Sequence, residues 1–366
     1  MAVNVNDYLF GSDGGYFVNN NYYPEIGYSD GYSFNTPNKE IQSKKILGYT
    51  YGYMANAGEI SSPKGIHSQE ILYELGNNWV CLAVTNYQKT YYSTHIYSDY
   101  VRTISDRDIE KFVRRAHAKN VKVCLKPMLN SEDEIWRAYI KFPDKVLNEY
   151  DTSYWKEWFD NYKHFMLKYA ELAEELGVEM LCIGCELMGT EHRKYEWLYL
   201  IDEIRKIYSG KLIYNSNHDH EEDAEWISAL DYIGTSAYYP VGENGNTKED
   251  MKKEWEKVKE RMNKLSDKLG KQYLFMEIGC RSAEGASKEP WAFDKTDLAV
   301  NEQEQADFYE SCLEVFLPEE RFGGMLWWDW STYIYDTKEE AKNDNGFGIH
   351  LKKAEEVVKK YYKKNK

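Results

Sequence analysis

Tyr273-Leu-Phe-Met-Glu-Ile-Gly-Cys280 is a short apolar run that carries one carboxylate, Glu277, near its C-terminal end. Its aromatic and branched residues predict a buried strand. A charge in such a place is costly unless it is paired or hydrogen-bonded, because water no longer solvates it. The run Met180-Leu-Cys-Ile-Gly-Cys-Glu-Leu187 repeats this arrangement with Glu186. One such glutamate more often anchors a helix or an arginine, but two indicate paired carboxyl groups for acid/base and nucleophilic chemistry.

Apolar runs of this kind alternate with helical patterns along most of the chain. Strands are expected near residues 46–54, 79–85, 121–127, 180–187, 212–215, 232–240, 273–280 and 323–330. Capping residues such as Ser105 and terminating glycines such as Gly270 mark the helices between them. This alternation predicts an α/β protein with a (β/α)8 TIM barrel. Residues 46–366 are expected to form one catalytic domain, and residues 1–45 an irregular N-terminal extension packed on the barrel.

The active site of such a barrel lies at the C-terminal ends of the strands. Glu186 would end the fourth strand and Glu277 the seventh, so their side chains can converge over the barrel mouth. Other strand ends offer polar groups for sugar hydroxyls and an aromatic face for a sugar ring: Asn86, Lys126, Asn215, Tyr238 and Trp328. Trp291, in the loop after the seventh strand, is a further candidate for substrate binding.

The eighth strand contains the run Leu326-Trp-Trp328. Successive side chains on a strand alternate between its faces, so Leu326 and Trp328 share one face and Trp327 lies on the other. If Leu326 points into the barrel, Trp328 also points inward, nearer the barrel mouth, and can lie beneath a sugar ring. A bulge would exchange the places of Trp327 and Trp328.

Composition favours a carbohydrate ligand. Aromatic residues make up 16% of the 366 residues, including 33 Tyr and 11 Trp, and aromatic rings pack well on the C–H faces of sugars. An aromatic-rich core with exposed tyrosines would have the same composition. The net charge of −15 disfavours nucleic acid and anionic membranes as partners and is compatible with a neutral polysaccharide or oligosaccharide. No run approaches the length of a membrane-spanning helix.

The 6 cysteines all fall in predicted core elements, five in strands and Cys312 in a helix. They therefore indicate buried free thiols and a reducing compartment. A cytoplasmic location is expected, because the N-terminus lacks a signal-peptide pattern, unless a leader has been removed. Cys182 and Cys185 form a C-x-x-C pattern, but residues three apart on a strand face opposite sides, which disfavours a metal site. His218 and His220 lack a third ligand, so neither a metal nor a cofactor is expected.

Six short segments, distributed in order from residue 46 onward, resemble the β-mannanases of glycoside hydrolase family 113 in clan A. They are Gly52-Tyr-Met54, Leu125-Lys-Pro127, Ile183-Gly-Cys-Glu-Leu187, Ala237-Tyr-Tyr-Pro240, Phe275-Met-Glu-Ile-Gly279 and Leu326-Trp-Trp328. The resemblance implies that Glu186 is the general acid/base and Glu277 the nucleophile. It also implies that Tyr238 steadies the nucleophile and that Trp328 forms the floor under the reacting sugar. Much of the clan has an Asn where this chain has Cys185, so the sugar 2-hydroxyl contact must come from another residue.

The expected function is a retaining endo-β-1,4-mannanase that hydrolyses mannan or manno-oligosaccharides by double displacement. Its two carboxyl groups should lie about 5–5.5 Å apart. Apolar surroundings and the nearby negative charge should raise the pKa of Glu186, whereas hydrogen bonds from Tyr238 or Lys126 should keep Glu277 ionised. The alternatives are another retaining clan A β-glycosidase, such as an exo-mannosidase or a β-glucanase, and a non-catalytic sugar-binding barrel. The presence of both carboxylates disfavours the last.

Overall fold

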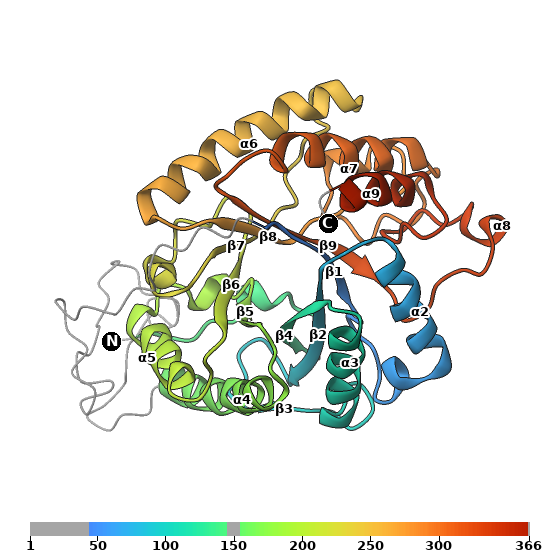
Figure 1. The fold of residues 1–366 in the computed structure, drawn as a ribbon. Helices are drawn as coiled ribbons and strands as arrows, with labels where there is room; N and C mark the ends of the chain where they lie inside the picture. The colour runs from blue at the N-terminus through green and yellow to red at the C-terminus, as the bar shows by residue number, and fades with distance from the viewer. Residues whose placement is uncertain (1–43, 145–153, 365–366) are drawn as a thin grey trace, which may run out of the picture.

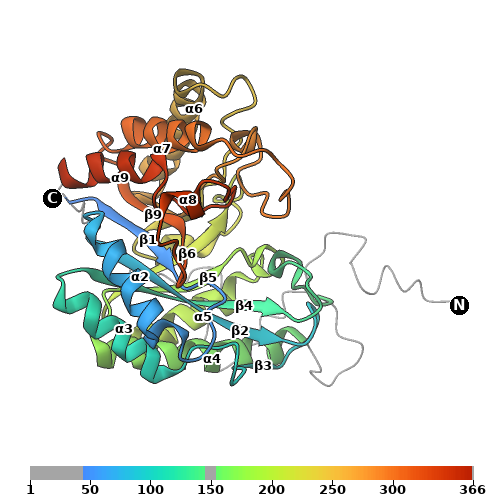
Figure 2. The same ribbon diagram turned by 90° about the vertical axis from the view of Figure 1, so that its right-hand side faces the viewer.

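The computed structural model describes residues 44–144 and 154–364. Within these residues the strands follow the order β1-β9-β8-β7-β6-β5-β4-β2-β3, and β1 also pairs with β2. This last pairing closes the sheet into a barrel, in which every neighbouring pair of strands is parallel. Figures 1 and 2 show the helices arranged around the strands. The (β/α)8 barrel predicted from the sequence is therefore confirmed.

The barrel strands lie close to their predicted positions. They are β1 (Ile46–Tyr51), β2 (Trp79–Gln88), β4 (Lys122–Ser131), β5 (Met180–Cys185), β6 (Lys211–Asn217), β7 (Ile233–Ser236), β8 (Tyr273–Glu277) and β9 (Phe322–Trp330). The prediction missed β3 (Ile96–Tyr97), which pairs antiparallel with the end of β2, because two residues are too few to show a pattern. Cys280 lies beyond β8 rather than in it, because the ladder with β7 ends at Glu277.

Helices connect the strands on the outside of the barrel. The long ones are α2 (Pro63–Glu74), α3 (Asp106–Ala118), α4 (Tyr154–Leu176), α5 (Lys194–Arg205), α6 (Lys248–Leu269), α7 (Glu302–Phe316) and α9 (Lys353–Lys364). The connection from β6 to β7 contains only the 3-10 helix η4 (Glu225–Ala229). Shorter elements are η1 (Glu59–Ser61), η2 (Arg137–Tyr139), η3 (Met188–Thr190), η5 (Ala286–Lys288) and α8 (Lys338–Ala341).

Local sequence signals account for the ends of several helices. Ser105 and Asp108 form the predicted capping box at the start of α3, where each side chain accepts a hydrogen bond from the other residue's backbone N–H. Gly270 ends α6 with a φ of 67°, in the left-handed region that glycine adopts without steric penalty. These local signals set where the helices between the strands begin and end.

The core is divided by the wall of the barrel. A large cluster lies between strands and helices and includes Trp327, whose ring stacks on Tyr309 of α7 with centroids 3.9 Å apart. A second cluster contains only residues on the strands or directly beside them and fills the barrel interior: Ile46, Trp79, Cys81, Cys124, Met180, Cys182, Ile213, Tyr232, Leu274, Met276 and Leu326. Leu326 thus points inward and Trp327 outward, as the sequence predicts.

The strand register is irregular near the ends of β5 and β8, where Cys185 and Glu277 point into the barrel. The pairing of β5 with β6 shifts between Cys182 and Cys185, and the pairing of β7 with β8 shifts just before Glu277. Such bulges reorient the side chains that follow them. The prediction that Cys182 and Cys185 face opposite sides is therefore wrong, because both join interior clusters.

The predicted N-terminal extension, residues 1–45, lies outside the described residues except for Lys44 and Lys45. The Lys45 ammonium donates to the backbone carbonyl of Glu319, with Nζ and O 2.5 Å apart. In the described part of the chain, every helix is too short or too polar to cross a membrane.

Candidate active site

The Glu277 carboxylate lies buried at the end of β8 and accepts hydrogen bonds on both oxygens. Its Oε1 forms an ion pair with Lys126 of β4. The same oxygen accepts from Asn215 Nδ2 at 3.1 Å and from the Cys185 thiol at 3.3 Å. Its Oε2 accepts from the Tyr238 hydroxyl at 3.2 Å. Charged and polar donors of this kind form their strongest hydrogen bonds with a carboxylate.

The donors around Glu277 keep their protons. Burial lowers the pKa of Lys126, but the negative charge of Glu277 in contact with it opposes burial, and the pKa of Lys126 lies well above its usual range. For the acids Cys185 and Tyr238 burial acts in the opposite direction and raises the pKa well above the usual range. The lysine therefore remains an ammonium, and the thiol and hydroxyl remain neutral donors.

Glu186 directly follows β5 and has a φ of 53°, in the left-handed region that non-glycine residues rarely adopt. Its backbone N–H donates to the Asn215 carbonyl at 2.8 Å, which fixes this conformation. Burial, followed by the negative charge of Glu277, raises the pKa of Glu186, and Arg137 opposes that rise. This is the direction predicted from the sequence. Glu186 therefore holds a proton more readily than an ordinary glutamate.

Trp136 and Arg137, which the sequence reasoning missed, contact Glu186 directly. Trp136 Nε1 and Arg137 Nη1 each donate to Glu186 Oε2 at 3.3 Å. Arg137 Nη1 also lies 3.7 Å from Cys185 Sγ, and the Cys185 thiol in turn donates to Glu277. Cys185 therefore connects the contacts of the two carboxyl groups. The only sequence signal for this pair was an aromatic residue beside an arginine in the loop after the third barrel strand.

Trp328 provides an aromatic surface beside these groups. Its half-buried side chain packs against a small cluster of Ala83, Met128 and Cys185, together with Tyr53. The Trp328 and Tyr53 ring centroids are 4.7 Å apart, and Lys126 Nζ lies 5.8 Å from the Trp328 ring centroid. The aromatic face and the Lys126–Glu277 ion pair therefore adjoin one another.

Two predicted site residues make no hydrogen bond to Glu186 or Glu277 within residues 44–144 and 154–364. Asn86 donates to the Tyr169 hydroxyl of α4 at 2.9 Å and accepts from Ser98 at 2.8 Å. β2 continues past Asn86 to Gln88, so Asn86 lies within the strand and not at its end, and its role in substrate binding stays a prediction. Trp291 is 43% exposed, and its ring stacks on that of His218 with centroids 5.5 Å apart.

His218 and His220, which the sequence does not predict to bind a metal, contact other side chains. His218 packs against Trp291, and His220 Nδ1 lies 2.6 Å from the Asp223 carboxylate. Among the residues that the structure describes, His, Cys, Asp and Glu form no group of three or more suited to a metal ion. All six cysteines are buried with free thiols.

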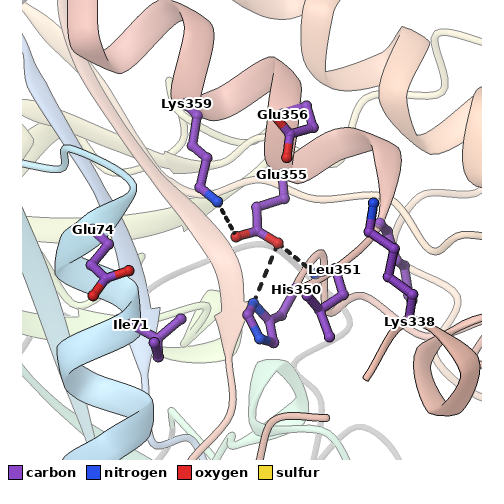
Figure 3. Close-up of a pocket in the computed structure, with 9 residues that line it drawn as sticks. Ile71, Glu74, Lys338, His350, Leu351, Glu355, Glu356 and Lys359 are labelled. Carbon is purple, nitrogen blue, oxygen red and sulfur yellow. Dashed lines mark hydrogen bonds and ion pairs between the residues drawn. The ribbon is translucent and has the colours of Figure 1, made fainter. Parts of the chain in front are cut away.

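A cavity of about 130 Å3 lies elsewhere, between α2 and α9 in the helical layer. Figure 3 shows Glu355 at its centre, in contact with His350, Lys359 and the backbone of Leu351. Burial opposes the charged form of Glu355, but these partners outweigh burial and lower its pKa to about 2. The charge of Glu355 is therefore matched within the protein, and its contacts tie α9 to the segment directly before it.

Known proteins resemble this chain over most of its length. The sequence profile of Glycoside Hydrolase Family 113 matches residues 49–352. A family 113 β-mannanase from Alicyclobacillus acidocaldarius, solved in complex with ManMIm, is 32% identical, with a TM-score of 0.81 over 89% of this chain and 99% of that one. A structure described as a GH113 β-1,4-mannanase is 31% identical, with a TM-score of 0.80 over 87% and 99% of the two chains.

More distant structures share the fold alone. A β-glucuronidase from Faecalibacterium prausnitzii is 11% identical, with a TM-score of 0.58, and aligns over 88% of this chain and 49% of its own. The comparison with curated proteins found no match.

Proposed function

The chain belongs to glycoside hydrolase family 113, and we propose that this clan A glycoside hydrolase is a retaining endo-β-1,4-mannanase. We assign Glu277 as the nucleophile and Glu186 as the general acid/base. The substrate would be mannan or manno-oligosaccharides, which are neutral and therefore compatible with the acidic protein. The two similar structures described as β-mannanases support this substrate class.

The observation that carries the proposal is the contrast between the two carboxyl environments. Glu277 receives an ion pair from Lys126 and a hydrogen bond from Tyr238, which favour the charged form. Burial and the charge of Glu277 favour the protonated form of Glu186. The donors around Glu277 suit a nucleophile, and the surroundings of Glu186 suit a proton donor.

In the first step, Glu277 would attack the anomeric carbon as Glu186 transfers its proton to the glycosidic oxygen. The bond between this carbon and the leaving oxygen breaks, and an ester to Glu277 forms. In the second step, water attacks the same carbon, Glu186 takes a proton from the water, and the Glu277 carboxylate is released. The two inversions together retain the anomeric configuration.

A product profile on mannan, glucan and xylan oligosaccharides tests the substrate and the mode of action. Internal cleavage of mannan into a range of oligosaccharides is expected, with the β-anomer appearing first in proton NMR spectra. Release of mannose alone would indicate an exo-acting mannosidase, and preferential cleavage of glucan would indicate a β-glucanase. An α-anomer as the first product would contradict the retaining mechanism.

Trp328→Ala is expected to lower kcat/KM on manno-oligosaccharides by roughly 30- to 1000-fold, equivalent to about 2–4 kcal/mol. The reason is its half-buried ring beside the Lys126–Glu277 pair. The melting temperature should change little. Trp327→Ala serves as the matched variant, because this ring is fully buried against Tyr309 and its loss should cost about 3–5 kcal/mol of stability. The opposite pattern would mean that Trp327, not Trp328, lines the site.

Neither a chelator nor a reducing agent is expected to change the rate of mannan hydrolysis. The proposed steps use only carboxyl groups and water, and the six thiols are buried and free, as in proteins of reducing compartments. Initial rates with EDTA and, separately, with dithiothreitol check this expectation. Strong inactivation by EDTA that added metal reverses would contradict it.

A further inference from the structure

Both hydrogen bonds that Glu186 receives from the loop after β4 end on the same carboxyl oxygen. Trp136 Nε1 and Arg137 Nη1 donate to Oε2, each at 3.3 Å. Trp136 lies directly before η2 and Arg137 is its first residue. A single short segment therefore donates both hydrogen bonds to Oε2 and none to Oε1.

The segment is held firmly in this position. Arg137 is buried, its Nε donates to the Leu129 carbonyl at 3.0 Å, and its Nη2 donates to Asn130 Oδ1 at 2.6 Å. The guanidinium is planar, so two fixed nitrogens also fix the direction of the third. Trp136 packs edge-on against Tyr139, with ring centroids 6.0 Å apart. The Arg137 donor is therefore in place before any substrate arrives, and Trp136 precedes it directly in the chain.

We propose that Trp136 and Arg137 are positioning residues that anchor Oε2 of Glu186, so that Oε1 carries the proton and delivers it. This inference rests on the proposed function, in which Glu186 is the general acid/base. An oxygen that already accepts two N–H groups is a poor site for a proton, because the proton would face two donor hydrogens. The anchor thus selects both the oxygen that reacts and the orientation of the carboxyl group.

The same contacts assist the proton transfer itself. When the O–H bond at Oε1 breaks, the proton passes to the glycosidic oxygen and the bonding electron pair stays on the carboxyl group. Oε2 then shares the new negative charge, and hydrogen bonds to a charged acceptor are stronger than those to a neutral one. In the second step, Oε1 accepts the proton of the attacking water.

Several groups influence the ionisation of Glu186, and the test must isolate one of them. Glu277 from β8 raises its pKa, whereas Arg137, Ser236 from β7 and Lys126 from β4 lower it. Trp136 is neutral, so its replacement changes a hydrogen bond without changing any charge. Trp136→Phe removes the N–H and keeps an aromatic ring. Tyr139→Phe is the matched control, because Tyr139 touches the Trp136 ring but makes no contact with Glu186 among the described residues.

The experiment measures the pH dependence of kcat/KM on manno-oligosaccharides for wild type, Trp136→Phe and Tyr139→Phe. Without the indole donor the anionic form of Glu186 is less stable, so its pKa rises. The alkaline limb, where the general acid loses its proton, should therefore move up by about half a pH unit to one unit in Trp136→Phe. At the optimum, kcat should fall about 3- to 10-fold, and KM should change less. Tyr139→Phe should keep the wild-type limb.

A second substrate separates proton delivery from folding or binding damage. A 2,4-dinitrophenyl β-mannobioside needs little protonation of its leaving group, so the rate of its first step should change less than twofold in Trp136→Phe. An alkaline limb that stays in place, moves down, or moves equally in Tyr139→Phe overturns the proposal. Failure of the proposed function is distinguishable, because mannan cleavage would then survive Glu186→Ala.

Discussion

Glu277→Ala is expected to lower kcat on mannan by roughly 100,000-fold, which corresponds to about 7 kcal/mol of barrier. Without the carboxylate no ester to the enzyme forms, and double displacement cannot begin. The change also leaves the buried Lys126 ammonium without its ion-pair partner, so stability should fall by about 3–5 kcal/mol. Turnover must therefore be measured well below the melting temperature of the variant. Circular dichroism gives that temperature.

Azide provides a positive readout for this variant. A small anion can occupy the space beside Lys126 and attack the anomeric carbon of an activated aryl mannobioside, and a single displacement gives the α-glycosyl azide. Glu191→Gln is the matched control: Glu191 is buried just beyond Glu186 and accepts from the Tyr214 hydroxyl at 2.7 Å. Burial raises the pKa of Glu191 to about 7, so a neutral amide resembles it closely. Near-wild-type turnover by Glu277→Ala would refute the assignment of the nucleophile.

Glu186→Ala should produce a different defect, which depends on the leaving group. On mannan, kcat/KM is expected to fall by about 100- to 10,000-fold, because the sugar leaving group needs a proton. On a 2,4-dinitrophenyl β-mannobioside the first step should remain fast, and the glycosyl-enzyme should accumulate because no base activates water. Stopped-flow release of dinitrophenol should then show a burst followed by slow turnover.

The reaction with azide distinguishes Glu186→Ala from Glu277→Ala. In Glu186→Ala it would attack the glycosyl-enzyme, which has already undergone one inversion, and so give the β-glycosyl azide. The two variants should thus yield opposite anomers from the same reagent. The same anomer from both, or equal losses on both substrates, would mean that the roles assigned to Glu186 and Glu277 are wrong.

The balance of charge at the site explains why these effects should be large. Lys126, the strongest donor to Glu277, lies inside the barrel with its side chain fully buried. An ion pair of this kind is held in place by its surroundings, and removal of one member leaves an uncompensated charge. Arg137 stands in a similar relation to Glu186, at a longer distance of 3.3 Å. Among the described residues, Glu277 forms its ion pair with Lys126 and Glu186 with Arg137, and the tighter pair belongs to the proposed nucleophile.

Much of this arrangement follows from the sequence alone. Strand and helix periodicities are local, so they predict the barrel without knowledge of any contact. In a parallel barrel all strands end at the same face, so the strand-end positions of Glu186 and Glu277 predict a common site. Alternation along β9 likewise predicts that Trp328 points inward and Trp327 outward. The contacts of Tyr238 and Lys126 with Glu277 are those proposed from the sequence.

Only the tertiary structure decided the details that depend on pairing across strands and on the paths of loops. The bulges before Cys185 and Glu277 arise from register with neighbouring strands, and a single strand carries no record of its partner's register. The extension of β2 past Asn86 is set by its ladder with β4. Trp136 and Arg137 lie in a loop without periodicity, whose path depends on contacts with Leu129, Asn130 and Glu186. Local pattern therefore sufficed for the fold and the two carboxyl groups, whereas long-range contacts determined which other side chains surround them.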